Sequence, residues 1–220
     1  MFPRRSLLLG LIAIVLSAPP LVARGQEISP NVQLLAAARV GDSVGVARAL
    51  ASGATPDARN RIGETALVIA LKSGRVELAR QMLDAGADVN IAAVNGVTPL
   101  MAAAHGGYTE IARALLAKGA AIDPVDRLKK NAMTYAAGQG STDIVRLLLG
   151  AGADPNATYA HALTALMWAA GYGHTETVRA LLAAGARIDL RDDRGKTALD
   201  IAREENFQET VKLLETASKT

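Results

Sequence analysis

The sequence of 220 residues predicts an all-α solenoid built from stacked helix-turn-helix units. Two observations predict this fold. A 33-residue period runs through most of the chain, and each period holds two short segments with apolar residues at helical spacing, separated by a glycine. The composition agrees, because half of the residues are hydrophobic but only 3% are aromatic, as suits closely packed helices rich in alanine and leucine.

Four kinds of residue recur in a fixed phase along the chain. The glycines that mark the period are Gly53, Gly86, Gly119, Gly152 and Gly185. An alanine follows each of these glycines, a leucine precedes it by three positions, and Asp or Asn follows it by four. A unit of this length cannot bury its apolar face alone, so the units are expected to stack on one another.

Residues 1–25 are predicted to be a cleaved export signal. Arg4 and Arg5 precede an apolar run at residues 7–18, and cleavage would leave Gln26 at the new N-terminus. An uncleaved anchor is disfavoured, because this run would rise only about 18 Å as a helix against a hydrocarbon core of about 30 Å. We therefore expect no membrane insertion after cleavage. The paired arginines also match a twin-arginine signal, so we expect a bacterial periplasmic protein exported by the Sec or the twin-arginine route.

A short linker at residues 26–30 is expected to lead into six units. The first, at residues 31–59, lacks the helix-start motif of the others, and the last, at residues 192–217, is more polar. Both are expected to cap the ends of the stack, because terminal units of a solenoid need one face that tolerates water. The four full repeats between them are predicted at residues 60–92, 93–125, 126–158 and 159–191.

One unit shows why each period should fold as two helices. Thr98 can cap the first helix, and Gly107 breaks it. Glu110 favours the positive N-terminal end of a second helix, and Ile111, Leu115 and Leu116 are expected to form its buried stripe. Gly119 ends this helix at a position suited to a left-handed backbone. A polar loop then leads to the next unit. Two of these loops are expected to be less regular, because Lys129 and Ala162 stand where the others have glycine.

These residues resemble the ankyrin repeat. The resemblance lies in Thr98-Pro99-Leu100-Met101-Ala102-Ala103-Ala104, in Gly107-Tyr108-Thr109-Glu110-Ile111 and in Leu115-Leu116-Ala117-Lys118-Gly119-Ala120. It extends over about residues 31 to 217. It implies hairpin-like loops that project at one edge of the stack, a concave groove, and a protein partner bound by the groove and the loop tips.

The charge pattern argues against nucleic-acid binding. Three arginines precede the first acidic residue, Glu27, and the remainder of the chain carries 21 residues of each sign. A neutral body lacks the uncompensated cations that phosphate contacts require. On the predicted second helices an acid precedes a base by three positions, which predicts a self-neutralised surface. These pairs are Glu77–Arg80, Glu110–Arg113, Asp143–Arg146, Glu176–Arg179 and Glu209–Lys212.

No motif predicts an enzyme, a metal site or a cofactor. Gly41-Asp42-Ser43-Val44-Gly45 matches the nucleophile-elbow string, but it occupies the turn between paired helices, where no strand precedes the serine. The chain has no cysteine, and its three histidines do not pair at helical spacing. Two alternatives to a binding scaffold stay open. They are an envelope hydrolase that uses His105 or His161 with a groove carboxylate, and a purely structural spacer.

The scarce aromatic residues predict the centre of a binding patch. Tyr135 and Trp168 are 33 residues apart, and Tyr172 lies one helical turn beyond Trp168, so all three are expected to cluster. The alternative is that Trp168 only fills space between helix and loop. The resemblance adds further partner-binding candidates by their place in the repeat: Asn95, Val97, His105, Arg127, Leu128, Lys130, His161 and Leu163. We expect a monomer that binds a protein partner through these residues.

Overall fold

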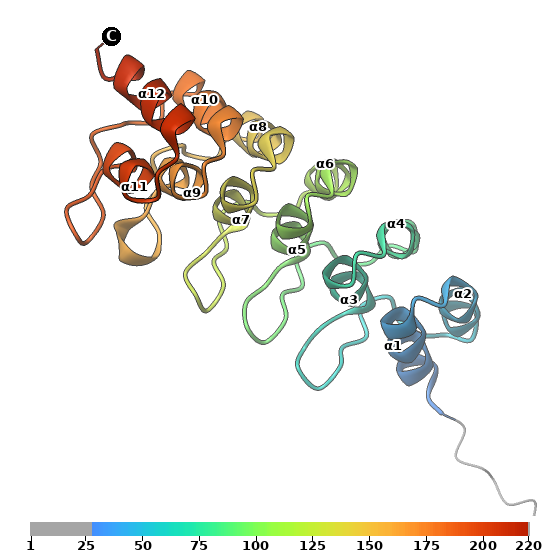
Figure 1. The fold of residues 1–220 in the computed structure, drawn as a ribbon. Helices are drawn as coiled ribbons and strands as arrows, with labels where there is room; N and C mark the ends of the chain where they lie inside the picture. The colour runs from blue at the N-terminus through green and yellow to red at the C-terminus, as the bar shows by residue number, and fades with distance from the viewer. Residues whose placement is uncertain (1–27, 220) are drawn as a thin grey trace, which may run out of the picture.

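The computed structural model describes residues 28–219, so the predicted export signal at residues 1–25 and most of its cleavage region lie outside the described residues. Within residues 28–219 the chain forms twelve α-helices and one 3₁₀ helix, with two isolated β-bridges and no longer strand. The helices stack in pairs along one direction, which confirms the predicted all-α solenoid (Figure 1).

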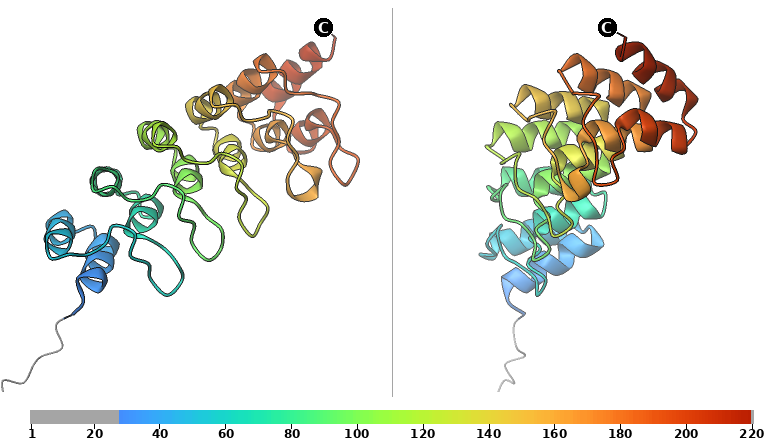
Figure 2. Two further views of the ribbon diagram at one scale, coloured as in Figure 1. Left: turned by 180° about the vertical axis from the view of Figure 1, so that it is seen from behind. Right: turned by 90° about the vertical axis from the view of Figure 1, so that its left-hand side faces the viewer.

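The helices form two layers, and the loops project from the edge of the first layer (Figures 1 and 2). The first layer contains α1 (Pro30–Val40), α3 (Ala66–Lys72), α5 (Pro99–Gly106), α7 (Ala132–Gly138), α9 (Ala165–Gly171) and α11 (Ala198–Glu204). The second layer contains α2 (Ser43–Ala51), α4 (Val76–Asp84), α6 (Thr109–Ala117), α8 (Thr142–Gly150), α10 (Thr175–Ala183) and α12 (Gln208–Ala217). The short 3₁₀ helix η1 (Ala160–Ala162) lies in the loop that precedes α9.

Side-chain caps fix where five of the six first-layer helices begin, and only α1 has none. The hydroxyl of Thr98 accepts a hydrogen bond from the backbone N–H of Met101 at 3.2 Å, which satisfies an amide that the helix itself leaves unpaired. Thr65, Thr164 and Thr197 cap their helices in the same way. Asn131 accepts from the N–H of Thr134 at 2.9 Å, so the unit that lacks the threonine keeps its cap.

The core lies between the two layers and runs without interruption from the first unit to the last. Its members are mostly alanine and leucine, and Leu100, Ile111 and Leu115 are almost fully buried. Leu116, which the sequence placed in the same buried stripe, is only partly buried. Truncation of a fully buried leucine to alanine typically costs about 2–5 kcal/mol, so this core holds neighbouring units together.

The recurring Asp or Asn of the period links one unit to the next at three of its five positions, Asp57, Asn90 and Asn156. Asn90 accepts a hydrogen bond from the N–H of Ala121 at 2.9 Å and donates to the carbonyl of Gly119 at 3.1 Å. Asn156 makes the same two bonds to the following unit, with Arg187 and Gly185. The amide side chain thus replaces backbone pairing between loops of adjacent units, which explains its place in the period.

The five projecting loops share one hydrogen-bond frame. They span residues 60–64, 93–97, 126–130, 159–163 and 192–196. In each, the N–H of the first residue donates to the carbonyl of the last, and the N–H of the fourth donates to the carbonyl of the first. Glycine at the fourth position has a positive φ in three of the loops, such as Gly195 at 77°.

The two loops without this glycine behave differently. Lys129 adopts a left-handed backbone with φ of 58°, so the loop at 126–130 keeps the frame and the expectation of irregularity was wrong there. In the loop at 159–163 both His161 and Ala162 are left-handed, with φ of 60° and 54°, and the tip winds into η1. The expectation of a less regular loop is confirmed at that position.

Single backbone hydrogen bonds join the tips of successive loops. The N–H of Val94 donates to the carbonyl of Ile62 at 3.0 Å, and Arg127 donates to Asn95 at 2.9 Å. Asp193 donates to His161 at 3.1 Å. The equivalent bond between the loops at 126–130 and 159–163 is missing from the described chain, where the tip has wound into η1.

The charged face of the second layer matches the prediction in four of its five pairs. The acid and the arginine three positions later approach within 4 Å in α4, α6, α8 and α10. Glu209 and Lys212 of α12 form no ion pair in the described structure. Within residues 28–219 no helix has both the length and the apolar character needed to span a bilayer.

Candidate functional site

A groove runs between the first helix layer and the loops, and three adjoining cavities make it up. The first, of about 380 Å³, lies over α3 and α5, the second, of about 330 Å³, over α5, α7 and α9, and the third, of about 260 Å³, over α9 and α11. The first and second cavities share His105 and Tyr135, and the second and third share Trp168 and Tyr172. The groove is therefore continuous across five units, from α3 to α11.

The centre of the groove is a cluster of two aromatic rings and a lysine. Trp168 and Tyr172 stack with their ring centroids 6.1 Å apart and their planes 12° from parallel. The Nζ atom of Lys130 lies 4.1 Å from the centroid of Trp168 and 5.8 Å from that of Tyr135. An ammonium group over an indole face is worth about 0.5–1 kcal/mol at exposed sites. Lys130 thus bridges the aromatic residues of two neighbouring units.

Tyr135 is held in place from the loop side. Its hydroxyl donates a hydrogen bond to the carboxylate of Asp126 at 2.6 Å. Burial, together with this hydrogen bond and the negative charge of Asp126, raises the pKa of Tyr135 well above the ordinary tyrosine value. Asp126 also accepts from the N–H groups of Leu128 and Lys130 at 2.8 and 2.9 Å. The tyrosine is therefore a neutral and rigid part of the groove wall.

Two histidines line the same stretch of the groove. His105 contacts the edge of Tyr135 with centroids 5.5 Å apart, and its Nδ1 lies 3.4 Å from the amide nitrogen of Gln139. His174 bonds through Nε2 to the carbonyl of Gly138 at 3.1 Å and stacks on Tyr172 at 6.2 Å. These contacts give both imidazoles positioning roles.

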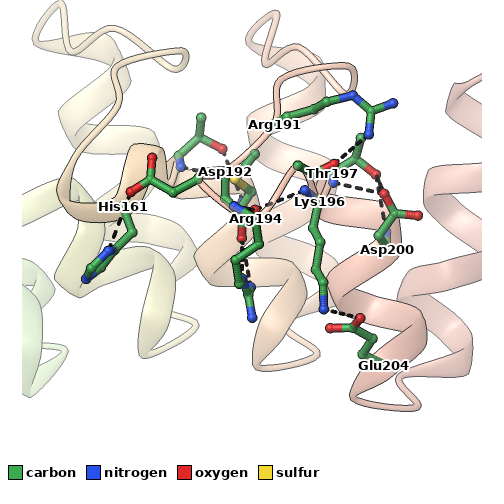
Figure 3. A network of polar contacts seen from close by, with 12 residues as sticks. His161, Arg191, Asp192, Arg194, Lys196, Thr197, Asp200 and Glu204 are labelled. Atoms are coloured by element: carbon green, nitrogen blue, oxygen red, sulfur yellow. Dashed lines mark hydrogen bonds and ion pairs between the residues drawn. The ribbon is translucent and has the colours of Figure 1, made fainter.

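Two lysine–glutamate pairs border the central part of the groove. Lys72 donates to Glu64 at 2.5 Å, and Lys196 pairs with Glu204, toward which it extends from its loop in Figure 3. Burial would raise the pKa of Glu64, but hydrogen bonds from Lys72 and Asn60 outweigh it and hold the pKa below the ordinary glutamate value. The outer units thus neutralise their own groove charges.

The last loop carries a further polar network, shown in Figure 3. Arg194 pairs with Asp192 at 2.7 Å, and Asp192 also accepts from the N–H groups of Arg194 and Lys196 at 2.9 Å each. Burial would raise the pKa of Asp192, but these hydrogen bonds lower it on balance. The carboxylate of Asp200 accepts from the N–H of Thr197 at 3.0 Å and from its hydroxyl at 2.8 Å. The charged side chains of this loop therefore pair within the loop and stabilise its conformation.

Family models match most of the chain. The model for ankyrin repeats in three copies matches residues 86–159 and 133–219, and the single ankyrin repeat model matches residues 62–93. The chain belongs to the ankyrin repeat family. Ankyrin repeats generally mediate protein–protein interactions, and the family is typically non-catalytic. No curated protein matches the chain significantly.

Most of the residues that the sequence predicted for partner binding line the ankyrin groove. Asn95 and Val97 lie in the first cavity, and Leu163 lies in the third. The other groove-lining candidates are His105, Lys130, Tyr135, Trp168 and Tyr172. The predicted aromatic cluster is present, with Lys130 rather than direct ring contact joining Tyr135 to Trp168.

Three predicted residues lie away from the groove, at the tips of the ankyrin loops. Arg127 and Leu128 line none of its cavities, and the side chain of Leu128 is 64% exposed. His161 lines a fourth cavity of about 370 Å³ at the loop edge, which shares Leu163 and Arg194 with the third, and its Nδ1 lies 3.5 Å from the carboxylate of Asp193. These side chains are available to a partner that also contacts the loop edge.

The geometry around the histidines offers no nucleophile for the hydrolase alternative. Across residues 28–219, no serine or threonine hydroxyl is hydrogen-bonded to His105 or His161. The pair formed by His161 and Asp193 is open to solvent, with side chains 81% and 59% exposed. Ser43, in the elbow-like string, opens α2 directly after the helix α1 and is no strand-to-helix turn.

Sequence reasoning missed the part that Gly138 plays. It lines the second cavity, beside the rings of Trp168 and Tyr172. A signal was present, because Gly138 occupies the same place in its repeat as Lys72 and Glu204, the two residues that form groove ion pairs. Alignment of the units by the period would have shown that the central unit lacks this charge.

Proposed function

We propose that this ankyrin repeat protein is a non-catalytic interaction scaffold of the cell envelope, which binds a partner protein through the groove. The observation that carries the proposal is the cluster of Lys130, Trp168 and Tyr172 at the centre of three adjoining cavities. Trp and Tyr are the residues most often found to dominate binding energy, with losses of about 2 kcal/mol or more on truncation.

The exposure of the cluster supports a binding role over simple space filling. Tyr172 is 55% exposed, although its stacking on Trp168 and His174 orders it. An ordered and exposed aromatic ring loses little conformational entropy when a partner covers it. The continuous groove is long enough to take an extended segment of polypeptide across several units.

Site-specific photocrosslinking tests the proposal. The photoreactive residue p-benzoylphenylalanine replaces Tyr172 in one variant and Arg113 in a matched control, whose side chain lies on the exposed face of α6. Irradiation in intact cells is expected to give a discrete protein adduct from position 172 and none from position 113. Adducts at both positions, or at 113 alone, would place the interaction surface outside the groove.

A second pair of variants measures the contribution of the aromatic cluster. Trp168→Ala together with Tyr172→Ala is expected to abolish recovery of the partner, whereas Arg113→Ala leaves it unchanged. Circular dichroism checks that all variants stay folded. If the folded double variant recovers the same partner as the wild type, the groove is not the binding site and the spacer alternative gains support.

The envelope location is a separate part of the proposal and rests on the sequence of residues 1–25. A mature protein that begins at Gln26 and fractionates with periplasmic markers is the expected result, and N-terminal sequencing with cell fractionation measures it. Arg4→Lys together with Arg5→Lys distinguishes the routes, because only the twin-arginine route depends strictly on both arginines. Light scattering is expected to show a monomer.

A further inference from the structure

Two of the five units with a projecting loop place a charged pair at the same two positions of the groove. The positions are those of Glu64 and Lys72 in one unit, and the same positions recur at Lys196 and Glu204 with the charges exchanged. In both units the cation and the anion neutralise each other across the groove surface. The repeat itself therefore contains a built-in place for an ion pair.

The unit at residues 126–158 fills only one of these two positions. Lys130 occupies the place of Lys196, but the place of Glu204 is taken by Gly138. No carboxylate in the described chain lies within ion-pair distance of Lys130. The carboxylate of the nearby Asp126 accepts hydrogen bonds from the hydroxyl of Tyr135 and from two backbone N–H groups. The ammonium group is thus left without an anionic partner at the centre of the groove.

The surroundings of Lys130 favour an anion over a cation. Its ammonium group already covers the face of Trp168, so a second cation would meet like charge at the aromatic surface. None of the residues that line the cavity is acidic. Gly138 leaves open the space that Lys72, His105 and Glu204 fill in three other units, because an added Cβ would have Trp168 as its nearest neighbour, at 3.6 Å. The following unit also has a glycine at this place, Gly171.

One donor at the site also lacks an acceptor. The indole Nε1–H of Trp168 is buried and has no hydrogen-bond partner in the described structure. An unpaired buried donor is destabilising, so a ligand oxygen that reaches this N–H gains a hydrogen bond. The cavity has one lysine and otherwise mainly apolar and aromatic walls. It therefore suits a ligand that carries one negative charge on a largely apolar group.

We infer that the cavity between α5, α7 and α9 binds a carboxylate of the partner polypeptide, with Lys130 as its counter-ion and with Trp168 and Tyr172 packing on the adjoining apolar atoms. The inference rests on the proposed groove function and names the chemistry that this part of the groove recognises. The carboxylate comes either from an Asp or Glu side chain or from a C-terminus, and the test separates these two sources.

Phage-displayed random dodecapeptides provide the probe. Selection against the wild-type protein is expected to enrich Asp or Glu next to an aliphatic or aromatic residue, and selection against Lys130→Gln is expected to lose this enrichment. Lys129→Gln is the matched control, because it removes the same charge one position away at an exposed residue. Its selected peptides are expected to keep the acidic residue. A wild-type selection without acidic enrichment, or without any binder, would overturn the inference.

Synthetic peptides then measure the interaction directly. Trp168 is the only tryptophan in the chain, so its fluorescence reports binding at this cavity. Replacement of the selected Glu by Gln in the peptide is expected to weaken binding to the wild type at least tenfold and to leave binding to Lys130→Gln unchanged. Each peptide is made with a free and with an amidated C-terminus, and a loss caused by amidation alone assigns the carboxylate to the C-terminus.

The outcomes separate this inference from the proposed function. Binding to Trp168→Ala, which has no tryptophan, is measured by isothermal titration calorimetry. Peptides that lose affinity with Trp168→Ala but respond neither to Lys130→Gln nor to the acid-to-amide change would leave groove binding intact and refute the carboxylate. Peptides that bind Trp168→Ala as well as the wild type would refute the groove site itself. The acid-to-amide change in the peptide leaves the protein unaltered, so misfolding of a variant cannot account for a loss.

Discussion

Lys130 and Lys196 hold the same place in two units of the repeat, yet their surroundings differ. Lys196 pairs with Glu204, whereas Lys130 faces Gly138 and lies over the ring of Trp168. The backbone positions are equivalent, so one neighbouring residue decides whether the charge is used within the protein or presented to a partner. If the carboxylate site that we infer is correct, a uniform scaffold acquires it by omission of a side chain as well as by addition of aromatic rings.

The largest effect is expected when the central unit is given the carboxylate that it lacks. Gly138→Glu would pair with Lys130 and fill the cavity, so affinity for an acidic peptide is expected to fall about 100-fold, equivalent to about 2.7 kcal/mol. Folding should change little, because Gly138 has helical backbone and an added Cβ would make only ordinary van der Waals contacts, the nearest at 3.6 Å. Fluorescence titration measures the affinity, and urea unfolding measures the stability.

Gly150→Glu provides the control for this substitution. Gly150 also ends a helix, α8, and nothing lies within 4 Å of an added Cβ there. The same charge and the same helix-favouring residue are thus placed in the second layer, outside the groove. Equal loss of peptide affinity in both variants would mean that overall charge, rather than the cavity, determines binding.

A smaller effect is expected from the turn glycine beneath this site. Gly140 has φ of 67°, and an added Cβ would lie 2.6 Å from Nδ1 of His174. Gly140→Ala is therefore expected to cost about 2 kcal/mol of stability through backbone strain and displacement of this imidazole. Gly152→Ala is expected to cost about 1 kcal/mol, because its φ is 95° but its Cβ would meet nothing within 4 Å. Urea unfolding of both variants measures the difference, and equal costs would show that His174 yields without penalty.

A still smaller change in stability is expected when the ion pair of Lys196 with Glu204 is removed. The side chains of Lys196 and Glu204 are 31% and 48% exposed, so their attraction is weakened by solvent. Glu204→Gln is expected to change the free energy of unfolding by less than about 1 kcal/mol. A larger loss of stability in urea unfolding would mean that the ion pair stabilises the last unit. It would also mean that the missing pair at Lys130 destabilises the central unit unless the aromatic contacts of Lys130 compensate.

The smallest expected effect is on stability at low pH, and it arises from Asp200 in the unit that contains Lys196. Hydrogen bonds from the N–H and the hydroxyl of Thr197 lower the pKa of Asp200. A lowered pKa in the folded state contributes stability above the unfolded value of about 3.9, and this contribution disappears as the pH falls through the folded value. The wild type is therefore expected to lose more stability between pH 7 and pH 3 than Asp200→Asn does. Thermal unfolding at both pH values measures this, and equal losses would contradict it.

The 33-residue period made the fold predictable, because the residues that recur in every unit are the ones that form its helices and turns. The glycines, the capping residues and the buried stripe follow from local geometry that each unit repeats. Leu116 was misplaced because its burial depends on how the second layer turns relative to its neighbours. Lys129 was misjudged because the loop frame, fixed by hydrogen bonds at both ends, holds a lysine in a left-handed backbone that glycine would adopt more easily.

The site was predictable in its aromatic part and less so in its charged part. The positions of Tyr135, Trp168 and Tyr172 in the repeat predicted that they would cluster. The contact between Lys130 and Trp168 joins a loop of one unit to a helix of the next, and it depends on side-chain conformations that no spacing rule contains. Gly138 matters because it lacks a charged side chain. This lack can be recognised only once the ion pairs at the equivalent positions of other units are known.

The row of loop tips is interrupted once, between the loops at 126–130 and 159–163, beside the cavity assigned to the carboxylate. On either side of this point, backbone hydrogen bonds couple each tip to its neighbour, so a pull on one loop is shared by the next. At the interruption side chains take over this link, because the amide of Asn131 donates a hydrogen bond to the hydroxyl of Tyr159 at 2.6 Å and Lys130 lies over the ring of Trp168. Beside the central cavity the two halves of the row are therefore joined through side chains, whereas everywhere else their tips are joined through the backbone.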